Sequence, residues 1–276
     1  MYLTENFLRK VQPFASPRMG TEVMAPLLYN MVRFTRPKTC LEIGMGYTSL
    51  FIAKALADNY ADYMKGREGM LKAAEAFDVE PGKSVRDAFS KADKSARLAY
   101  LESYPYLSDP AFYEDTDPTP GRLVAIDDMS SGETSANVIS AALTSLDLDA
   151  HVDVVTGDFR GLSDKVKSQF GAIDFIWFDC GGMCEYRDFL EEYWALLNPD
   201  GGLLVMHYTL TNTSMGYVRQ NLEKKLADGT LPGAEILSLR EPHKMMQNSF
   251  TMVKRTDGFK DEIYTEVRDI SLERDT

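Results

Sequence analysis

The stretch over residues 39–54 constrains the fold of this chain more than any other. A short apolar run ends in Glu42, and an apolar helical pattern starts near Ser49. Gly44 and Gly46 lie between them, so the order predicts a strand, a tight turn and a helix N-terminus. Glycine lets a ligand approach the backbone closely, and a helix N-terminus favours negative charge. The stretch therefore predicts a binding site for an anionic ligand group.

Strands and helices alternate along most of the remaining chain. Apolar runs predict further strands at about 122–126, 151–155, 172–178, 203–207, 234–240 and 248–254. Helical spacing predicts two helices within 3–34, broken near 13–17, and others over 48–57, to about 146, over 186–197 and over 213–227. Ser130 and Glu133 have capping-box spacing for the helix that ends near 146. Such alternation predicts an α/β fold with a parallel sheet covered on both faces.

The segment 59–120 interrupts this alternation. It carries helical stretches at about 60–77 and 83–103, with charges of both signs among Tyr, Met, Leu and Phe, and then a Tyr- and Pro-rich loop. An insertion of this length exceeds ordinary connections and is typical of lids, binding loops or interfaces. The predicted organisation is an N-terminal helical cap at 1–38, an α/β domain at 39–58 and 121–256, the helical insertion at 59–120, and an acidic tail at 257–276.

Composition excludes several classes of function. The net charge of -12 and the pI near 4.8 argue against a nucleic-acid partner, which requires a basic surface. The first residues lack the basic and apolar regions of a signal peptide, and no apolar run could span a membrane, so we expect a cytoplasmic protein. Cys40, Cys180 and Cys184 are expected to be free thiols. The apolar content of the insertion suggests a homodimer as a hypothesis.

Several predicted strands end in an acidic residue. These are Glu42, Asp127, Asp158 after Gly157, and Asp179. Ligands of open α/β sheets bind at the carboxyl ends of the strands, so the four acids point to one site. A dinucleotide site expects G-x-G-x-x-G with an acid about twenty residues later. Here a serine stands at the third glycine position and the next strand-end acid follows only after the insertion, which favours the competing interpretation, an S-adenosylmethionine (SAM) fold.

Five stretches resemble the class I SAM-dependent methyltransferases, especially the small-molecule branch that includes catechol O-methyltransferase-like enzymes. They are LEIGMGYTSL at 41–50, VAID at 124–127, VTGDF at 155–159, FIWFD at 175–179 and LLNPDGGLLV at 196–205. They follow the order and spacing of the family once the insertion is removed, and the resemblance covers roughly 20–57 and 121–255. The resemblance implies SAM as the cofactor and a seven-stranded Rossmann-like sheet whose last strand is antiparallel.

The resemblance also implies roles around the glycine turn. Gly44 and Gly46 would let the methionyl part of SAM lie against the backbone. Glu42 would support that turn from beneath or reach the ligand.

The other end of the cofactor would meet the later strands. Asp127 would accept hydrogen bonds from both ribose hydroxyls, a task that suits a carboxylate. Asp158 would accept from the adenine amine, with Phe159 beside the ring, although Asp158 could also be an ordinary turn residue. The full set expected at the cofactor is Glu42, Gly44, Gly46, Tyr47, Ser49, Asp127, Asp158, Phe159 and Asp179.

The reacting centre departs from the catechol-type pattern. That branch holds a divalent cation with an Asp after the fourth strand and an Asp-Asn pair after the fifth. Asp179 matches the first, but the fifth strand ends in VMHY at 205–208. A hard cation requires several oxygen ligands, so we expect no magnesium-dependent mechanism. A metal held by Asp179 and His207 is the alternative.

Direct acid–base chemistry is the other route. His207 could act as general base, because an imidazole pKa near 6.5 suits proton transfer, or it could be a structural histidine. Tyr208, Asp179 and Glu185 are candidates for orienting the acceptor, whereas His243 reads as a loop residue.

The leading hypothesis is a SAM-dependent methyltransferase that modifies O or N of a small molecule. The insertion and the N-terminal helices would then form the acceptor pocket. One alternative is an enzyme that transfers or cyclises the aminocarboxypropyl arm of SAM and releases methylthioadenosine. Another is a SAM-fold binding protein without catalysis.

Overall fold

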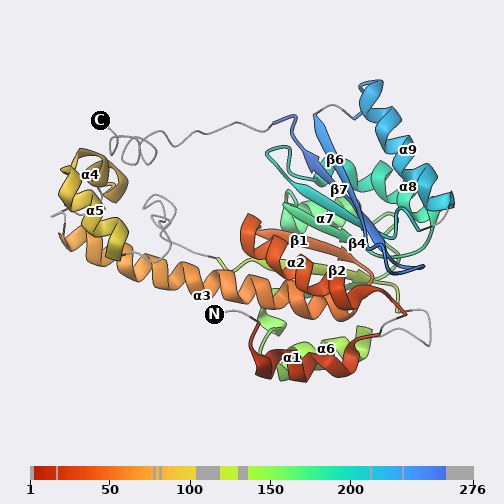
Figure 1. Cartoon of the computed structure of the whole chain (residues 1–276), viewed down its shortest axis with the longest axis horizontal. Helices are drawn as coiled ribbons and strands as arrows, with labels where there is room; N and C mark the ends of the chain where they lie inside the picture. The colour runs from red at the N-terminus through yellow and green to blue at the C-terminus, as the bar shows by residue number, and fades with distance from the viewer. Residues whose placement is uncertain are drawn as a thin grey trace. The chain divides into compact units, whose positions relative to one another are not determined.

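The computed structural model describes residues 3–16, 18–76, 79–80, 83–103, 119–129, 136–211, 213–231 and 233–258 (Figure 1). The helices are α1 (Glu5–Val11), α2 (Thr21–Thr35), α3 (Tyr47–Ala76), α4 (Val85–Lys91), α5 (Lys94–Ser103), α6 (Ala136–Ser145), α7 (Ser163–Phe170), α8 (Met183–Tyr193) and α9 (Thr213–Ala227). The strands are β1 (Thr39–Ile43), β2 (Arg122–Asp127), β3 (Val152–Thr156), β4 (Phe175–Phe178), β5 (Leu203–His207), β6 (Ala234–Arg240) and β7 (Ser249–Arg255).

The chain divides into two compact units. The first comprises Met1–Asn59 and Pro120–Lys260, and the second comprises Tyr60–Thr119 and Asp261–Thr276. Met70 of α3 and Phe89 of α4 are buried in the second unit. The first unit contains the sheet and all the predicted site residues.

The seven strands of the first unit form one sheet in the order β3-β2-β1-β4-β5-β7-β6. Neighbours from β3 to β5 are parallel, whereas β7 is antiparallel to both β5 and β6. The α/β sheet with an antiparallel last strand is therefore confirmed. Strand order reverses direction between β1 and β4, and ligands of doubly wound sheets bind beside such a switch.

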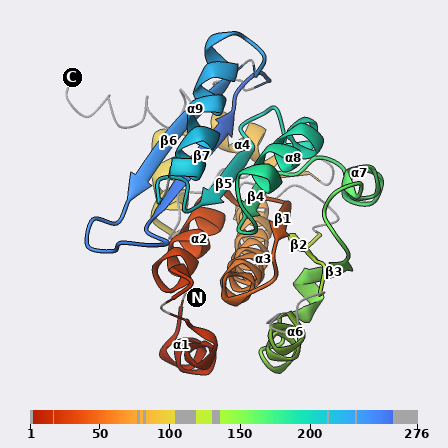
Figure 2. The ribbon, with the colours of Figure 1, turned by 90° about the vertical axis from the view of Figure 1, so that its right-hand side faces the viewer.

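Helices cover both faces of this sheet, as Figure 2 shows. Helices α1, α2, α3 and α6 lie on one face, and α7, α8 and α9 lie on the other. Side chains alternate between the faces along each strand. Cys40, Trp177 and Val205 accordingly belong to the core beneath α2 and α3, whereas Leu41 and Phe178 belong to the opposite core.

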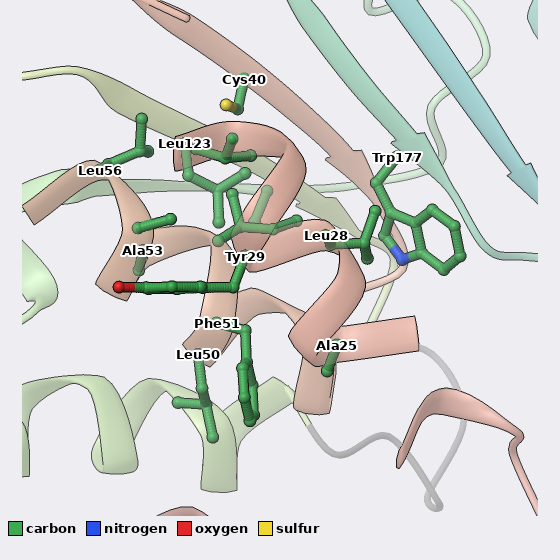
Figure 3. Close-up of a cluster of buried hydrophobic side chains, with 14 of the residues drawn as sticks. Ala25, Leu28, Tyr29, Cys40, Leu50, Phe51, Ala53, Leu56, Leu123 and Trp177 are labelled. Carbon is green, nitrogen blue, oxygen red and sulfur yellow. The ribbon is translucent and has the colours of Figure 1, made fainter. Parts of the chain in front are cut away.

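The core beneath α2 and α3 fixes these two helices against each other (Figure 3). Leu28 of α2 and Phe51 of α3 are completely buried. The Tyr29 hydroxyl donates to Asp58 Oδ2 at 2.8 Å, and Lys54 Nζ lies 2.6 Å from Asp58 Oδ1. A buried carboxylate with two partners joins the helices where apolar packing alone would leave their relative orientation less specified.

Two expected helix boundaries are wrong. The helices expected at 48–57 and 60–77 are one continuous helix, α3, because no Gly or Pro interrupts the residues between them. The helix expected at 83–103 is instead the pair α4 and α5. Asp93 causes this break, since its Oδ1 accepts from the Ala96 amide at 2.9 Å and so starts a new helix.

Helix α7 is absent from the sequence-based expectations. Val166 is its buried residue, and seven of its eight residues are polar or partly exposed, so it lacks a visible apolar stripe. The capping box at Ser130 and Glu133, the loop over 104–118 and the tail beyond 258 lie outside the described residues. Among the helices that the structure describes, none is long and apolar enough to cross a membrane.

Candidate functional site

The acidic and glycine residues predicted at strand ends meet in one row across the sheet. Ile43 pairs with Ile126 and with Phe178, and Phe178 in turn pairs with Met206. The next residue of each strand continues this register at the carboxyl edge. From β2 to β5 that row is Asp127, Gly44, Asp179 and His207.

The turn after β1 requires glycine at its first position. Gly44 has a φ of 92°, and its amide donates to the Ile126 carbonyl at 2.9 Å. A Cβ at Gly44 would lie 3.0 Å from the carbonyl oxygen of Asp179. Side chains rarely adopt this φ, so both the conformation and the close approach select glycine. The turn therefore lies directly against the end of β4 and leads into the first residue of α3, Tyr47.

Glu42 lies beneath this turn and is completely buried. The Thr48 hydroxyl donates to its Oε1 at 2.6 Å. Burial raises the pKa of Glu42 to about 8, although the hydroxyls of Ser49 and Thr48 oppose the shift. Oε2 has no hydrogen-bond partner among the described residues. This carboxyl group thus has one oxygen available to a ligand that reaches under the turn.

Asp127, at the end of β2, binds two backbone amides. Its Oδ2 accepts from the Met45 amide at 2.9 Å, and its Oδ1 accepts from the Met129 amide at 2.8 Å. Asp127 therefore orders the loop after β1 and the loop after β2.

The loop after β3 is held by an arginine. Arg160 Nη1 lies 3.2 Å from Asp158 Oδ2, and Arg160 Nε lies 2.8 Å from Asp188 Oδ2. Phe159 is 5% exposed, and its ring packs against Phe178 with centroids 5.7 Å apart. In this structure Asp158 lies at the surface, and Phe159 anchors the loop in the core. Their predicted roles at adenine stay predictions.

His207 and Asp179 form a hydrogen-bonded dyad. His207 Nδ1 lies 2.8 Å from Asp179 Oδ1, and the imidazole is completely buried. An ionised carboxylate only accepts, so the Nδ1–H donates to Asp179, and Nε2 is the ring nitrogen left for another partner. Nε2 has no hydrogen-bond partner within the part of the chain that the structure describes. The Trp177 ring lies beside the imidazole, with centroids 5.4 Å apart.

Tyr208 and Glu185 each bind a neighbouring loop. The Tyr208 hydroxyl donates to the Gly181 carbonyl, and burial raises the pKa of Tyr208, so the phenol stays neutral near pH 7. Glu185 Oε2 accepts from the Gly182 amide at 2.8 Å, which caps α8. Backbone hydrogen bonds, that of Gly182 first, lower the pKa of Glu185. Both side chains fix the loop after β4, which bears Asp179.

Two charged residues beside this site are absent from the sequence-based predictions. Glu22, in the first turn of α2, is hydrogen-bonded to Lys244 from the loop between β6 and β7. They are 222 positions apart, so no local motif connects them. The available signal was the position of α2: a helix directly before β1 must begin near the carboxyl edge of the sheet.

The last feature of the site is its set of side chains that could bind a metal ion. In the described ranges, no group of three or more His, Cys, Asp or Glu side chains could hold a metal ion. Cys40, Cys180 and Cys184 are free thiols, as expected.

Solved structures share this fold at low sequence identity. An O-methyltransferase from Bacillus cereus in complex with SAH is 13% identical, with 92% of each chain covered and a TM-score of 0.56. The O-methyltransferase TomG from Streptomyces achromogenes, involved in tomaymycin synthesis and bound to SAM, is 14% identical. That likeness covers 92% of this chain and 90% of TomG, with a TM-score of 0.55. No protein-family model and no curated protein matches the sequence. The likeness establishes the Rossmann-like fold of SAM-dependent methyltransferases.

Proposed function

We propose that this protein is a SAM-dependent methyltransferase that methylates a hydroxyl group of a small molecule. The observation that carries the proposal is the His207–Asp179 dyad in one row with the Gly44 turn and Asp127. A base beside a cofactor-binding turn is the arrangement that methyl transfer to a hydroxyl needs. The two O-methyltransferases described above, crystallised with SAH and SAM, support the choice of cofactor and reaction.

The residues at the carboxyl edge fit SAM. The Gly44 turn would lie against the methionyl part of SAM, at the N-terminus of α3. Oε2 of Glu42 would accept from the amino group of the ligand, and the Asp127 carboxylate would accept from the ribose hydroxyls. When bound, SAM supplies a methyl group attached to a positively charged sulfur.

His207 would supply the proton transfer. The hydroxyl oxygen of the acceptor bonds to the methyl carbon as the carbon–sulfur bond breaks, and S-adenosylhomocysteine (SAH) leaves. The hydroxyl proton passes to Nε2 of His207, while Asp179 holds Nδ1–H and stabilises the imidazolium. Tyr208 then acts through the Gly181 loop as a positioning residue.

The same proposal covers the acceptor and the location of the protein. The acceptor is a small metabolite rather than nucleic acid, because the chain carries a net charge of -12. The reaction takes place in the cytoplasm. The insertion would contribute to the acceptor pocket or to a homodimer. The reaction would need no added divalent cation, because the end of β5 supplies His207 where a hard cation requires oxygen ligands.

The test replaces the base and measures turnover and cofactor binding separately. His207→Ala should lower the rate of SAH formation about 10²-fold or more, while the Kd for SAM stays within about twofold. Asp179→Asn should also slow the reaction, because an amide can donate to Nδ1 and place the proton on Nε2. Unchanged rates in both variants would exclude His207 as the base.

His151→Ala is the matched control, since His151 lies at the amino end of β3, across the sheet from the site. Its turnover per folded protein should equal that of the wild type. Product masses separate the reaction classes. A methylated acceptor with SAH supports the proposal, whereas methylthioadenosine would indicate transfer or cyclisation of the aminocarboxypropyl arm. Turnover that survives EDTA supports the metal-free route, and turnover restored only by a divalent cation contradicts it.

A further inference from the structure

The first turn of α2 lies at the carboxyl edge of the sheet. Helix α2 ends at Thr35, only three residues before β1 begins at Thr39, so its C-terminus lies at the amino edge. Its 15 residues rise about 22 Å, slightly more than the roughly 17 Å of the five-residue β1. The helix therefore runs back along the sheet and places Glu22 beyond the strand ends, near the row that contains His207.

The charge of Glu22 interacts with residues on both sides of the site, Tyr47 and His207. Burial and then the negative charge of Glu22 raise the pKa of Tyr47, the first residue of α3. Burial alone would raise the pKa of Glu22, but the hydrogen bond from Lys244 lowers it, with a smaller contribution from His207. The Glu22 carboxylate is therefore ionised, and its charge acts on both sides of the site.

Four buried polar atoms on the elements around this position have no hydrogen bond to the described residues. They are Glu22 Oε2, Trp177 Nε1, His207 Nε2 and Oε1 of Gln247, a residue that packs against Gly20. Trp177 and His207 lie on the sheet face that α2 covers. Figure 3 shows Trp177 beside Leu28 of α2, the helix whose first turn carries Glu22. The unpartnered atoms of Trp177 and His207 thus lie on the sheet face that α2 covers, and Glu22 lies in the first turn of that helix.

A buried polar atom without a partner destabilises the protein, and a charged one does so more. An ionised carboxylate can only accept, so the group that satisfies Glu22 Oε2 must be a donor. Lys244 does not take this place, because it binds the other oxygen of Glu22 and lies 3.1 Å from Glu241. Lys244 supplies one positive charge to two carboxylates, Glu22 and Glu241. Neutral His243 lies 3.1 Å from the other oxygen of Glu241. The two carboxylates therefore keep a net negative charge, which favours a cationic ligand group.

We propose that Glu22 is a specificity-determining residue and that the acceptor carries a positively charged amine beside the hydroxyl that is methylated. This inference rests on the proposed function, since it names the class of acceptor for the same site. The ammonium group would donate to Glu22 Oε2, whereas a carboxylate in its place would be repelled. Acceptors with an anionic arm would therefore be excluded.

The test uses acceptors that differ only in charge. Catechols and simple phenols with an ethylammonium, an ethyl or an acetate arm are titrated calorimetrically into the full chain saturated with SAH. Their methylation with SAM is measured in parallel. The ammonium compounds should bind at least about tenfold more tightly than the acetate compounds, which corresponds to about 1.4 kcal/mol. The neutral compounds should lie between them.

Variants locate the cause of this preference. Glu22→Gln should abolish the preference for ammonium with little change for the neutral compounds, and Lys244 would keep Glu241 as its partner. Lys244→Gln, which frees Glu22, should strengthen the preference. Glu223→Gln is the control, because it removes a carboxylate from the exposed surface of α9 and should change nothing.

The outcomes separate the two proposals. The inference is overturned if the ammonium compounds do not bind, if acetate compounds bind equally well, or if both variants keep the wild-type preference. If Glu22→Gln does not fold, the Lys244→Gln result decides. The proposed function fails on different observations: no binding of SAM, or no SAH formed with acceptors of any charge.

Discussion

Glu42 is a carboxyl group that the fold keeps away from water at the base of the Gly44 turn. Its neighbours are the Thr48 hydroxyl and the charges of Asp127 and Asp179, which also raise its pKa after the larger effect of burial. With a pKa of about 8, Glu42 is mostly protonated at pH 7 in the ligand-free protein. This residue therefore links proton binding to folding.

Glu42 should make the protein less stable as pH rises from about 4.5 to 8. Below pH 4.5 both states are protonated, and above it the unfolded chain loses this proton first, so stability falls until pH passes the folded pKa. Each pKa unit corresponds to about 1.4 kcal/mol. Between pH 5 and 8, Glu42→Gln should therefore gain stability relative to wild type in ligand-free thermal unfolding. Glu5→Gln, on an exposed side chain, should show the same pH dependence of stability as the wild type. A pH profile of Glu42→Gln parallel to that of the wild type would contradict the raised pKa of Glu42.

Gly44 should tolerate no side chain. Gly44→Ala combines a φ of 92° with a Cβ 3.0 Å from the Asp179 carbonyl, so we expect a loss of about 1–3 kcal/mol in unfolding free energy. SAM affinity, measured by calorimetry, should fall at least about tenfold because the turn must move. Gly216→Ala in α9 is the control, since its Cβ would meet nothing within 4 Å. Normal SAM binding by Gly44→Ala would show that the turn is not part of the cofactor site.

Helices α2 and α3 are coupled by polar groups as well as by apolar packing. Asp58 is 5% exposed and binds both Tyr29 and Lys54, and Arg33 Nη1 lies 2.6 Å from Asn59 Oδ1. These bonds fix α2 against α3, and α2 in turn places Glu22 over the site. The second half of α2 thus determines the geometry at its first half.

Tyr29→Phe should destabilise the first unit by about 1–2 kcal/mol, because it removes one hydrogen bond from a buried carboxylate while the ring still fills its space. Urea unfolding measures the change. Tyr217→Phe on the exposed surface of α9 should lie within about 0.5 kcal/mol of the wild type. Equal stability of the two variants would show that the bond to Asp58 contributes nothing.

At the scale of the whole molecule, the insertion separates from the sheet unit in both sequence and structure. The residues on either side of it meet, since a Cβ at Gly121 would lie 2.8 Å from the Leu56 side chain. The Arg122 amide also donates to the Lys38 carbonyl at 2.9 Å, so β2 begins beside β1 without help from the insertion. The sheet unit therefore closes its own core.

Replacement of residues 60–119 by a short Gly/Ser linker should leave a protein that folds cooperatively and binds SAM. Its far-ultraviolet spectrum and its calorimetric SAM affinity are the measurements. Because we propose that the insertion contributes to the acceptor pocket, methylation should fall much more than SAM binding does. Loss of SAM binding together with folding would show that the first unit depends on the insertion.

The sequence by itself determined the fold class and the edge of the sheet that carries the site. Strand periodicity and the glycine turn are local signals, and the acids at strand ends meet because parallel strands share their direction. Asp127, Asp179 and His207 were therefore predictable as neighbours. The continuity of α3 and the presence of α7 were not, since helix breaks and weak apolar stripes depend on packing more than on local pattern.

Only the tertiary structure decided what the site residues contact. It paired His207 with Asp179, committed Tyr208 and Glu185 to neighbouring loops, and brought Glu22 to Lys244 across 222 positions. The physical reason is the range of the interactions. Backbone preferences act over a few residues, whereas hydrogen bonds and ion pairs act through space and appear only after the chain has folded.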